Sequence, residues 1–298
     1  MRIAIIGAGR MGRWFAKFFL EQGFTVVVSD KDREKLQTLK DELNVEVANN
    51  VKAVESADRI LICVPINNFE NVVRRISTHI QPWQEVMDIC SVKEMPVNIM
   101  HKYIKNAVSL GTHPMFGPGA KSIKNQNFIL TPTSTKERAL ARKIGRWLES
   151  KGAKVFFMHP HEHDIIMSIV IGLPYLLSYI TYDTILSHGY LSRAKNVSGV
   201  SYKLLSTIME ALISEDAELI ADIQTELQEI NKLGELLLEK TKEWLKIVKK
   251  KQKTTFIKKA TIIKNKIAET DPQYDRAYEI MYQMLEILQK YSKIRARP

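Results

Sequence analysis

The first twelve residues, MRIAIIGAGRMG, restrict the fold of this chain more than any other stretch of it. The apolar run at 2–7 has the composition of a strand that is buried on both faces of a parallel sheet. Its last residue is the first of three glycines spaced G-x-G-x-x-G, and an amphipathic helical pattern follows them. Strand, glycine turn and helix in this order are typical of a dinucleotide-binding βα unit. The opening therefore predicts an α/β domain with a dinucleotide over its first turn.

The residues of this turn have separate predicted tasks. Gly7 allows the tight turn, Gly9 lets a pyrophosphate approach the backbone, and Gly12 lets helix and strand pack closely. The pyrophosphate is expected on the helix N-terminus, beside Arg10 and Met11, where free N–H groups and the helix dipole favour an anion. We predict all five residues to be cofactor-binding.

The ends of the next two apolar runs supply further cofactor-binding candidates. Asp30 ends the second run, where a carboxylate accepts a hydrogen bond from a ribose 2′-hydroxyl and repels a 2′-phosphate. It favours NAD, although Lys31 and Arg33 next to it leave NADP open. Val64 and Pro65 close the third run and are predicted to line the adenine–ribose side, with an ordinary strand end as the alternative.

The two halves of the chain differ in pattern. Strand-like and helical runs alternate in the first half, which predicts a doubly wound Rossmann domain over 1–158. The expected strands are 2–7, 25–30, 59–64, 85–90, 107–111, 128–132 and 154–158. The second half, 159–298, is predicted to be all-helical, with helices at 162–188, 200–214, 216–250 and about 253–292. Such long helices are expected to bury their apolar faces against a twin subunit, as a homodimer.

Composition narrows the class of protein. The two cysteines, Cys63 and Cys90, sit in apolar runs, which suits a reducing cytoplasm rather than a disulfide framework. The longest apolar run, 165–180, is short and broken at Gly172 and Pro174, so we expect no membrane span. The net charge of +11 comes with lysines spread over helical segments, which indicates a solvated face rather than nucleic-acid binding.

Two candidate loops follow the fourth and fifth strands. The stretch GTHPMFG at 111–117 is predicted to be a loop, because its glycines and proline suit neither a helix nor the middle of a strand. His113 in it is a candidate general base for an alcohol that loses hydride. In the other loop, DICSVK at 88–93, Ser91 could fix the tautomer of that imidazole and Lys93 could hold an anionic group. Both loops are expected at the carboxyl ends of the strands, where α/β sheets bind ligands.

Five motifs together resemble the prephenate dehydrogenase family, which includes the arogenate dehydrogenases. They are GAGRMG at 7–12, DICSVK at 88–93, GTHPMFGPG at 111–119, HEHD at 161–164 and SEDAELIADIQ at 214–224. The resemblance implies a Rossmann domain, a helical dimerisation domain and NAD(P)-linked oxidative decarboxylation of a cyclohexadienol. It also implies that His113 accepts the proton of the ring hydroxyl and that Ser91 hydrogen-bonds near it.

The chain departs from the family where a substrate carboxylate is held. Ala211 stands where relatives carry a carboxylate-binding arginine, and 171–175 lacks the histidines that relatives have there. Lys203, Arg193 or a basic residue of the twin subunit are the candidates to replace them. Three explanations stay open: other residues bind the carboxylates of prephenate, the substrate is arogenate or another compound, or the chain is a divergent paralogue of weak activity.

Two other functions are compatible with these features. An oxidoreductase of the β-hydroxyacid dehydrogenase type would use Lys203 as its acid–base residue, and a non-enzymatic nucleotide- or nucleic-acid-binding protein would use the basic tail. The histidines at 159, 161 and 163 suggest a metal site, but Pro160 intervenes and a helix is expected to start at Asp164, so no metal is predicted.

Overall fold

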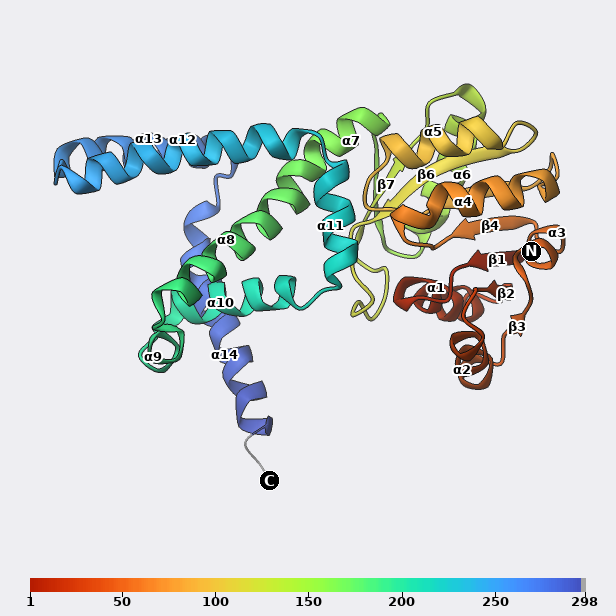
Figure 1. Cartoon of the computed structure of the whole chain (residues 1–298), viewed down its shortest axis with the longest axis horizontal. Coiled ribbons are helices and arrows are strands. Elements are labelled where there is room, and N and C mark those ends of the chain that lie inside the picture. The colour runs from red at the N-terminus through yellow and green to blue at the C-terminus, as the bar shows by residue number, and fades with distance from the viewer. Residues whose placement is uncertain (296–298) are drawn as a thin grey trace. The chain divides into compact units, whose positions relative to one another are not determined.

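The structure, a computed structural model, describes residues 1–295 (Figure 1). Two compact units divide the chain. The first unit consists of residues 1–168 with 221–229, and the second of residues 169–220 with those from 230 onward. The domain limits 1–158 and 159–298 stay a prediction.

The first unit is built on an eight-stranded sheet in the order β3-β2-β1-β4-β5-β6-β7-β8. Its strands are β1 (Arg2–Ile6), β2 (Thr25–Ser29), β3 (Glu46–Val47), β4 (Arg59–Ile62), β5 (Glu85–Asp88), β6 (Val108–Pro114), β7 (Asn127–Thr131) and β8 (Lys154–Phe157). All neighbouring strands are parallel except β6 and β7. The strand order reverses between β1 and β4, which is the switch point where doubly wound sheets bind ligands. The predicted α/β fold is confirmed, with the two-residue strand β3 added.

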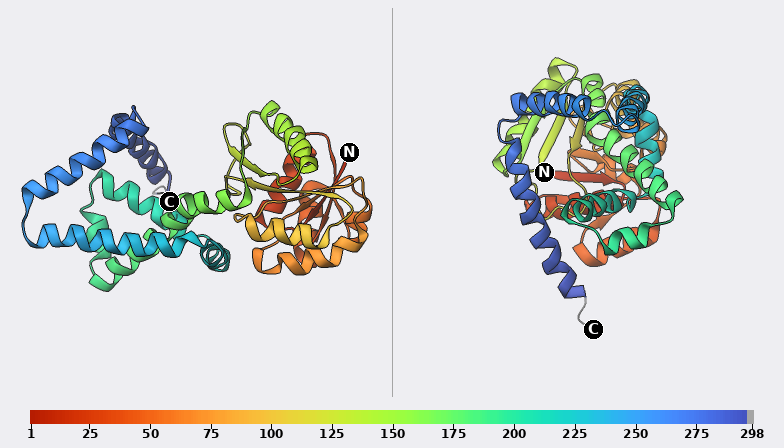
Figure 2. Two further views of the ribbon diagram at one scale, coloured as in Figure 1. Left: turned by 90° about the horizontal axis from the view of Figure 1, so that it is seen from above. Right: turned by 90° about the vertical axis from the view of Figure 1, so that its left-hand side faces the viewer.

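Helices cover both faces of this sheet (Figure 2). They are α1 (Arg10–Glu21), α2 (Arg33–Leu43), α3 (Asn50–Glu55), α4 (Ile66–Ile76), α5 (Glu94–Tyr103), α6 (Thr135–Ser150) and α7 (Pro160–Met167), with a short 3₁₀ turn at Ser77–His79. Helix α11 (Ala217–Glu226) begins in the second unit and ends in the first. The right-handed crossovers that join parallel strands require helices on both faces.

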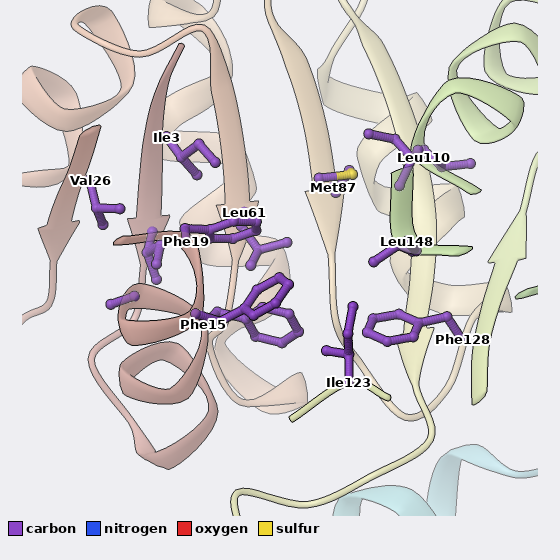
Figure 3. Packing of buried hydrophobic residues seen from close by; sticks show 14 of the residues in the cluster. Ile3, Phe15, Phe19, Val26, Leu61, Met87, Leu110, Ile123, Phe128 and Leu148 are labelled. Atoms are coloured by element: carbon purple, nitrogen blue, oxygen red, sulfur yellow. The ribbon is translucent and has the colours of Figure 1, made fainter. Parts of the chain in front are cut away.

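The core of the first unit lies between this sheet and α1 and α6. Phe15 and Phe19 of α1 lie near Leu61 of β4, and Phe128 of β7 lies near Leu148 of α6 (Figure 3). All five side chains are buried. Burial of a side chain of this size contributes roughly 1.5–3 kcal/mol. This packing fixes the sheet whose carboxyl ends carry the candidate site.

Strand β6 changes partner along its length. Residues Val108–Leu110 pair parallel with β5, and Gly111–Pro114 pair antiparallel with β7. The prediction of a loop is therefore wrong for 111–114 and holds from Met115 onward. Glycine is needed at 111 because a Cβ there would lie 2.3 Å from Oγ1 of Thr131. Pro114 is tolerated because it is the last residue of the strand.

The second unit is helical, as predicted. It contains α8 (Leu173–His188), α9 (Leu191–Asn196), α10 (Val200–Ile213), α12 (Glu229–Lys249), α13 (Lys253–Thr270), a 3₁₀ turn at Tyr274–Arg276 and α14 (Ala277–Arg295). Helix α9 was not predicted, and the predicted helices 216–250 and 253–292 are each broken once. Trp244 packs on Phe256 where α12 and α13 meet, and Figure 2 shows these helices diverging from their connecting turn.

Helices α7 and α8 are joined through a π-helical turn, Ser168–Gly172. The resulting helix, Pro160–His188, is long and apolar enough to cross a membrane by length and composition alone. The prediction that this run is too short and broken was wrong, because Gly172 and Pro174 do not end the helix. This criterion is weak evidence, since helices of soluble proteins also meet it.

Candidate active site

The glycine turn has the geometry that its sequence predicts. Gly7 has φ +114°, and a Cβ on it would lie 2.6 Å from the carbonyl oxygen of Cys63. A Cβ on Gly12 would lie 1.9 Å from the carbonyl oxygen of Gly7, so the start of α1 can approach β1 only with glycine there. A Cβ on Gly9, in contrast, meets no atom within 4 Å. The turn is tight at both ends and open above its middle residue.

The N-terminus of α1 suits an anion. Gly9 is its N-cap residue, no side chain of the described chain caps it, and its first turn carries no acidic residue. Gly9 and Arg10 are exposed, and Met11 packs against the core. Free N–H groups and the helix dipole give such an end a positive potential. These residues fit the pyrophosphate of a dinucleotide.

The carboxylate of Asp30 lies against the same turn. One of its oxygens accepts a hydrogen bond from the N–H of Ala8 at 2.6 Å, and the other accepts from the N–H of Asp32 at 2.9 Å. Val64, which follows β4, borders the turn, because its Cγ1 lies 3.2 Å from a Cβ built on Gly7. Pro65 is the exposed N-cap residue of α4. Asp30 and Val64 therefore contact the turn that follows β1.

His113 is at one end of a hydrogen-bonded chain of three side chains, with His163 in the middle and Asp164 at the other end. Its Nδ1 lies 2.8 Å from Nε2 of His163, and Nδ1 of His163 lies 2.7 Å from Oδ1 of Asp164. His113 comes from the end of β6, and the other two come from α7. His113 is 4% exposed and His163 is fully buried.

This chain defines the tautomers of both rings. An ionised carboxylate can only accept, so Nδ1 of His163 donates to Asp164, and Nε2 of His163 is left as an acceptor. Nδ1 of His113 must then donate to it, which leaves the lone pair of a neutral His113 on Nε2. The arrangement presents a proton acceptor at Nε2 of His113.

Burial keeps both rings neutral. It lowers the pKa of His113 well below its usual range, and electrostatic repulsion from neighbouring His163 and Lys93 acts in the same direction. Burial also lowers the pKa of His163, although its hydrogen bond to Asp164 opposes the change. A neutral imidazole can accept a proton, and a protonated one cannot.

Asp164 also holds the start of α5. Its two oxygens accept from the backbone N–H groups of Lys93, at 2.7 Å, and Glu94, at 2.8 Å. Its own helix α7 is capped by His159 instead. The expected helix-start role of Asp164 is thus wrong for α7, and the helix end that it satisfies belongs to α5. The loop after β5 and the histidine pair are joined through this carboxylate.

Lys93 and Asp88 form a fully buried ion pair behind the histidines. Asp88 also accepts from the backbone N–H groups of Cys90, at 2.8 Å, and Thr112, at 3.2 Å. The predicted contact of Lys93 with an anionic ligand would require its ammonium group to leave Asp88. In this structure Lys93 is held by Asp88, and Asp88 itself joins the end of β5 to Thr112 of β6.

The remaining predicted residues are not members of this chain of side chains. Ser91 is half-buried in the loop after β5, and His163 rather than Ser91 bonds Nδ1 of His113. Lys203 is exposed on α10, in the second unit. His161 pairs with Glu94 at 3.1 Å, and no group of three potential metal ligands occurs among the described residues.

Sequence reasoning missed His163 as a functional candidate. The signal was present, because His163 and Asp164 belong to the HEHD motif, but an adjacent pair on a helix gives no sign of which strand it faces. A cavity of about 410 Å³ borders Asp164 from the outer side of α5. Its wall also includes Glu70, Lys102 and Glu226, and His113 is not among its lining residues.

Comparison with known families agrees with this geometry. The prephenate dehydrogenase nucleotide-binding domain matches residues 15–157, and the prephenate dehydrogenase dimerization domain matches residues 159–283. The chain belongs to the prephenate dehydrogenase family. The match begins after the glycine turn, so the assignment of that turn depends on its own geometry.

Two named relatives are similar to this chain over most of its length. A probable arogenate/prephenate dehydrogenase of Methanocaldococcus jannaschii is 34% identical over 264 residues, which are 87% of this chain and 59% of the relative. The T-protein of Haemophilus influenzae is 28% identical over 227 residues, 74% of this chain and 55% of the relative. The chain therefore spans less than two thirds of the length of these relatives.

Solved structures share the fold. Prephenate dehydrogenase from A. aeolicus, in complex with hydroxyphenyl propionate and NAD+, has a TM-score of 0.76 at 21% identity, covering 91% of this chain and 98% of that one. Arogenate dehydrogenase from Synechocystis has a TM-score of 0.66 at 20% identity, covering 98% of this chain and all of that one.

Proposed function

We propose that the chain is a prephenate dehydrogenase that converts prephenate to 4-hydroxyphenylpyruvate, with arogenate as the alternative substrate. The observation that carries the proposal is the hydrogen-bonded chain from Asp164 through His163 to His113, at the end of a strand of the nucleotide-binding domain. The family assignment supports the reaction class, and its members are named after both substrates.

In this proposal His113 is the general base. Nε2 of the neutral ring accepts the proton of the substrate's ring hydroxyl, and the positive charge that forms is stabilised through His163 by the carboxylate of Asp164. Bound NAD would supply the acceptor for the hydride that leaves the carbon bearing this hydroxyl. Loss of the ring carboxylate as CO₂ gives an aromatic ring, whose phenolate oxygen takes the proton back from His113. Aromatisation drives the reaction without a metal or a covalent nucleophile.

NAD is the proposed cofactor, with the glycine turn and α1 holding its pyrophosphate. Asp30 supports NAD over NADP, because its carboxylate lies at the turn and would repel a 2′-phosphate. Lys31 and Arg33 next to it are exposed and could contact a 2′-phosphate, so NADP is assayed as well as NAD.

We propose that residues of the second unit bind the substrate carboxylates. Lys203 on α10 and Arg193 on α9 are exposed cations of this unit, and the altered family position Ala211 lies on α10. Glu210, next to Ala211, pairs with Lys195 at 2.5 Å, so Lys195 is engaged. A basic residue of a second subunit is the other source of charge.

A homodimer through the helical unit is part of the proposal. The matched dimerization domain supports it, and so does the exposure of large apolar side chains on α13, among them Ile257 at 54% and Ile263 at 45%. Exposed apolar surface of this extent is typical of a subunit interface.

One experiment tests the proposed function. The purified protein is assayed with prephenate and with arogenate, each with NAD and with NADP, by the near-ultraviolet absorbance of the reduced nicotinamide. We expect turnover with prephenate and NAD. Inert protein in all four combinations would contradict the proposal, and turnover with arogenate alone would select the alternative substrate.

A further inference from the structure

Trp14 connects the cofactor helix to the loop that follows His113. Its indole Nε1–H donates a hydrogen bond of 2.7 Å to the carbonyl oxygen of Ala120, 106 residues away in the sequence. Its ring also packs on Phe116 of the same loop, with 4.8 Å between ring centroids. Trp14 is two residues from Gly12, in the second turn of α1. One side chain therefore holds both ends of the Phe116–Ala120 segment against the helix whose N-terminus suits the cofactor.

Apart from the packing of Phe116 on Phe15 and Phe128, with 6.5 and 5.4 Å between ring centroids, the loop has few other constraints. A Cβ at Gly117 or at Gly119 would meet no atom within 4 Å, and neither glycine has a positive φ. These glycines are therefore not required by a close neighbour or a left-handed backbone, and they leave the chain conformationally free. The backbone bonds Met115 N–H to Asn127 C=O and Ala120 N–H to Gly117 C=O are at its two ends. A loop with free glycines needs an external anchor to keep one conformation.

We propose that Trp14 is a positioning residue, which anchors the Met115–Ala120 loop to α1 and so sets the place of His113 relative to the cofactor. The inference rests on the proposed function. Trp14 itself touches neither reacting group in this scheme. It acts because His113 is followed directly by Pro114, and the loop begins one residue later, so a displaced loop moves the end of β6.

The test compares Trp14→Phe with Trp147→Phe. Trp147 belongs to the same aromatic cluster, where its ring packs on Phe18 and Phe19, and its indole makes no hydrogen bond within the described chain. Both changes remove one indole from the core, but only Trp14→Phe removes the bond to Ala120. Trp147→Phe is therefore the matched control for packing.

For Trp14→Phe we expect kcat/KM for prephenate at saturating NAD to fall about three- to ten-fold, mostly in kcat, with the Kd of NAD within about two-fold of wild type. The acid limb of the pH profile should not move, because the bond from His113 to His163 is intact. Trypsin should cut faster after the exposed Lys121, which follows the loop. Trp147→Phe should match the wild type in all these measurements.

A second substitution tests whether a stiffer loop compensates for the loss of the Trp14 anchor. Gly117→Ala restricts the loop and fits the open space beside Gly117, so Trp14→Phe/Gly117→Ala should slow trypsin cleavage after Lys121 relative to Trp14→Phe. If Trp14→Phe behaves like Trp147→Phe in both rate and proteolysis, the proposal is overturned. Trp14→Leu, which also lacks a hydrogen-bond donor, replaces Trp14→Phe in the same comparison if that variant does not fold. Inert wild type would refute the proposed function, whereas the proteolysis comparison would still test the anchor.

Discussion

The two units of the molecule bury their apolar residues to very different degrees. In the first unit the strands and the helices packed on them have buried side chains such as Ile5, Phe19 and Leu110. In the second unit α13 has no buried residue, and α8 and α10 have one each, Ser178 and Leu204. The first unit completes its own core, whereas the second leaves apolar helix faces that need another surface. The hydrogen-bonded histidine chain lies in the complete unit, and the candidate carboxylate-binding residues lie in the incomplete one.

The largest expected effect follows from the incomplete unit. Ile257→Glu puts a charge on an apolar face of α13, and burying that charge at a subunit interface costs several kcal/mol, roughly enough to dissociate most dimers. We expect a monomer by light scattering and loss of most activity. Trp83→Glu, at a 71% exposed position of the first unit, is the control and should stay dimeric. A monomeric wild type, or an Ile257→Glu variant that stays dimeric, would show that the second unit does not use this apolar face to bind a second subunit.

The second prediction concerns the complete unit. Asp164→Asn replaces an obligatory acceptor by an amide that can also donate, so the tautomers of His163 and His113 are no longer fixed. We expect kcat to fall on the order of 10–100-fold, which is within the usual contribution of general base catalysis. Glu162→Gln, at the exposed acidic residue beside His163, should stay near the wild-type rate. Equal rates for the two variants would show that the chain of side chains does not assist His113.

Cofactor choice gives a smaller effect. Asp30→Ala removes the carboxylate that bonds Ala8 and leaves Lys31 and Arg33 in place. We expect the ratio of kcat/KM for NAD to that for NADP to fall about ten-fold, the usual size of one hydrogen bond to a charged group. The ratio is measured with both cofactors at one prephenate concentration. An unchanged ratio would mean that Asp30 stabilises the turn but makes no hydrogen bond to the ribose.

The smallest predicted effect is on stability in acid. The pKa values of His113 and His163 are lowered in the folded state, so the unfolded state binds more protons once the pH falls below the usual histidine value of about 6.5. This part of the free energy of unfolding is intact above that pH and is lost as the pH falls through the lower folded pKa values. The loss is at most about 1.4 kcal/mol per pH unit for each histidine. Thermal unfolding between neutral pH and mild acid should show a shallower slope for His113→Asn, and an equal slope would contradict the buried neutral ring.

The sequence predicted the first unit better than the second, for a physical reason. Strands buried on both faces read as continuous apolar runs, and the glycines at 7 and 12 are required by backbone geometry that is local in the sequence. Helix limits in the second unit depend on tertiary packing, so the breaks before α12 and α14 were missed. The short strand β3 was missed because two residues carry no periodic signal.

Within the candidate site, His113 was found and its partner was not. A histidine after an apolar strand can be recognised from the chain, but its contact with His163 spans fifty residues and depends on the fold. Lys93 shows the same limit: its partner Asp88 lies in the same motif, but DICSVK does not reveal that both side chains are fully buried. The partners of titratable side chains are the part of the site that the sequence did not reveal.

The base assignment of His113 is the central claim, and one measurement tests it most directly. Initial rates with prephenate and NAD are compared for the wild type, His113→Asn and Lys203→Ala, together with the Kd of NAD. The account predicts that His113→Asn loses about 10²–10⁴-fold in kcat while its Kd for NAD stays within about two-fold, and that Lys203→Ala mainly raises KM. A near-normal rate for His113→Asn, or a collapse of kcat in Lys203→Ala alone, would contradict it and point to a lysine-based dehydrogenase.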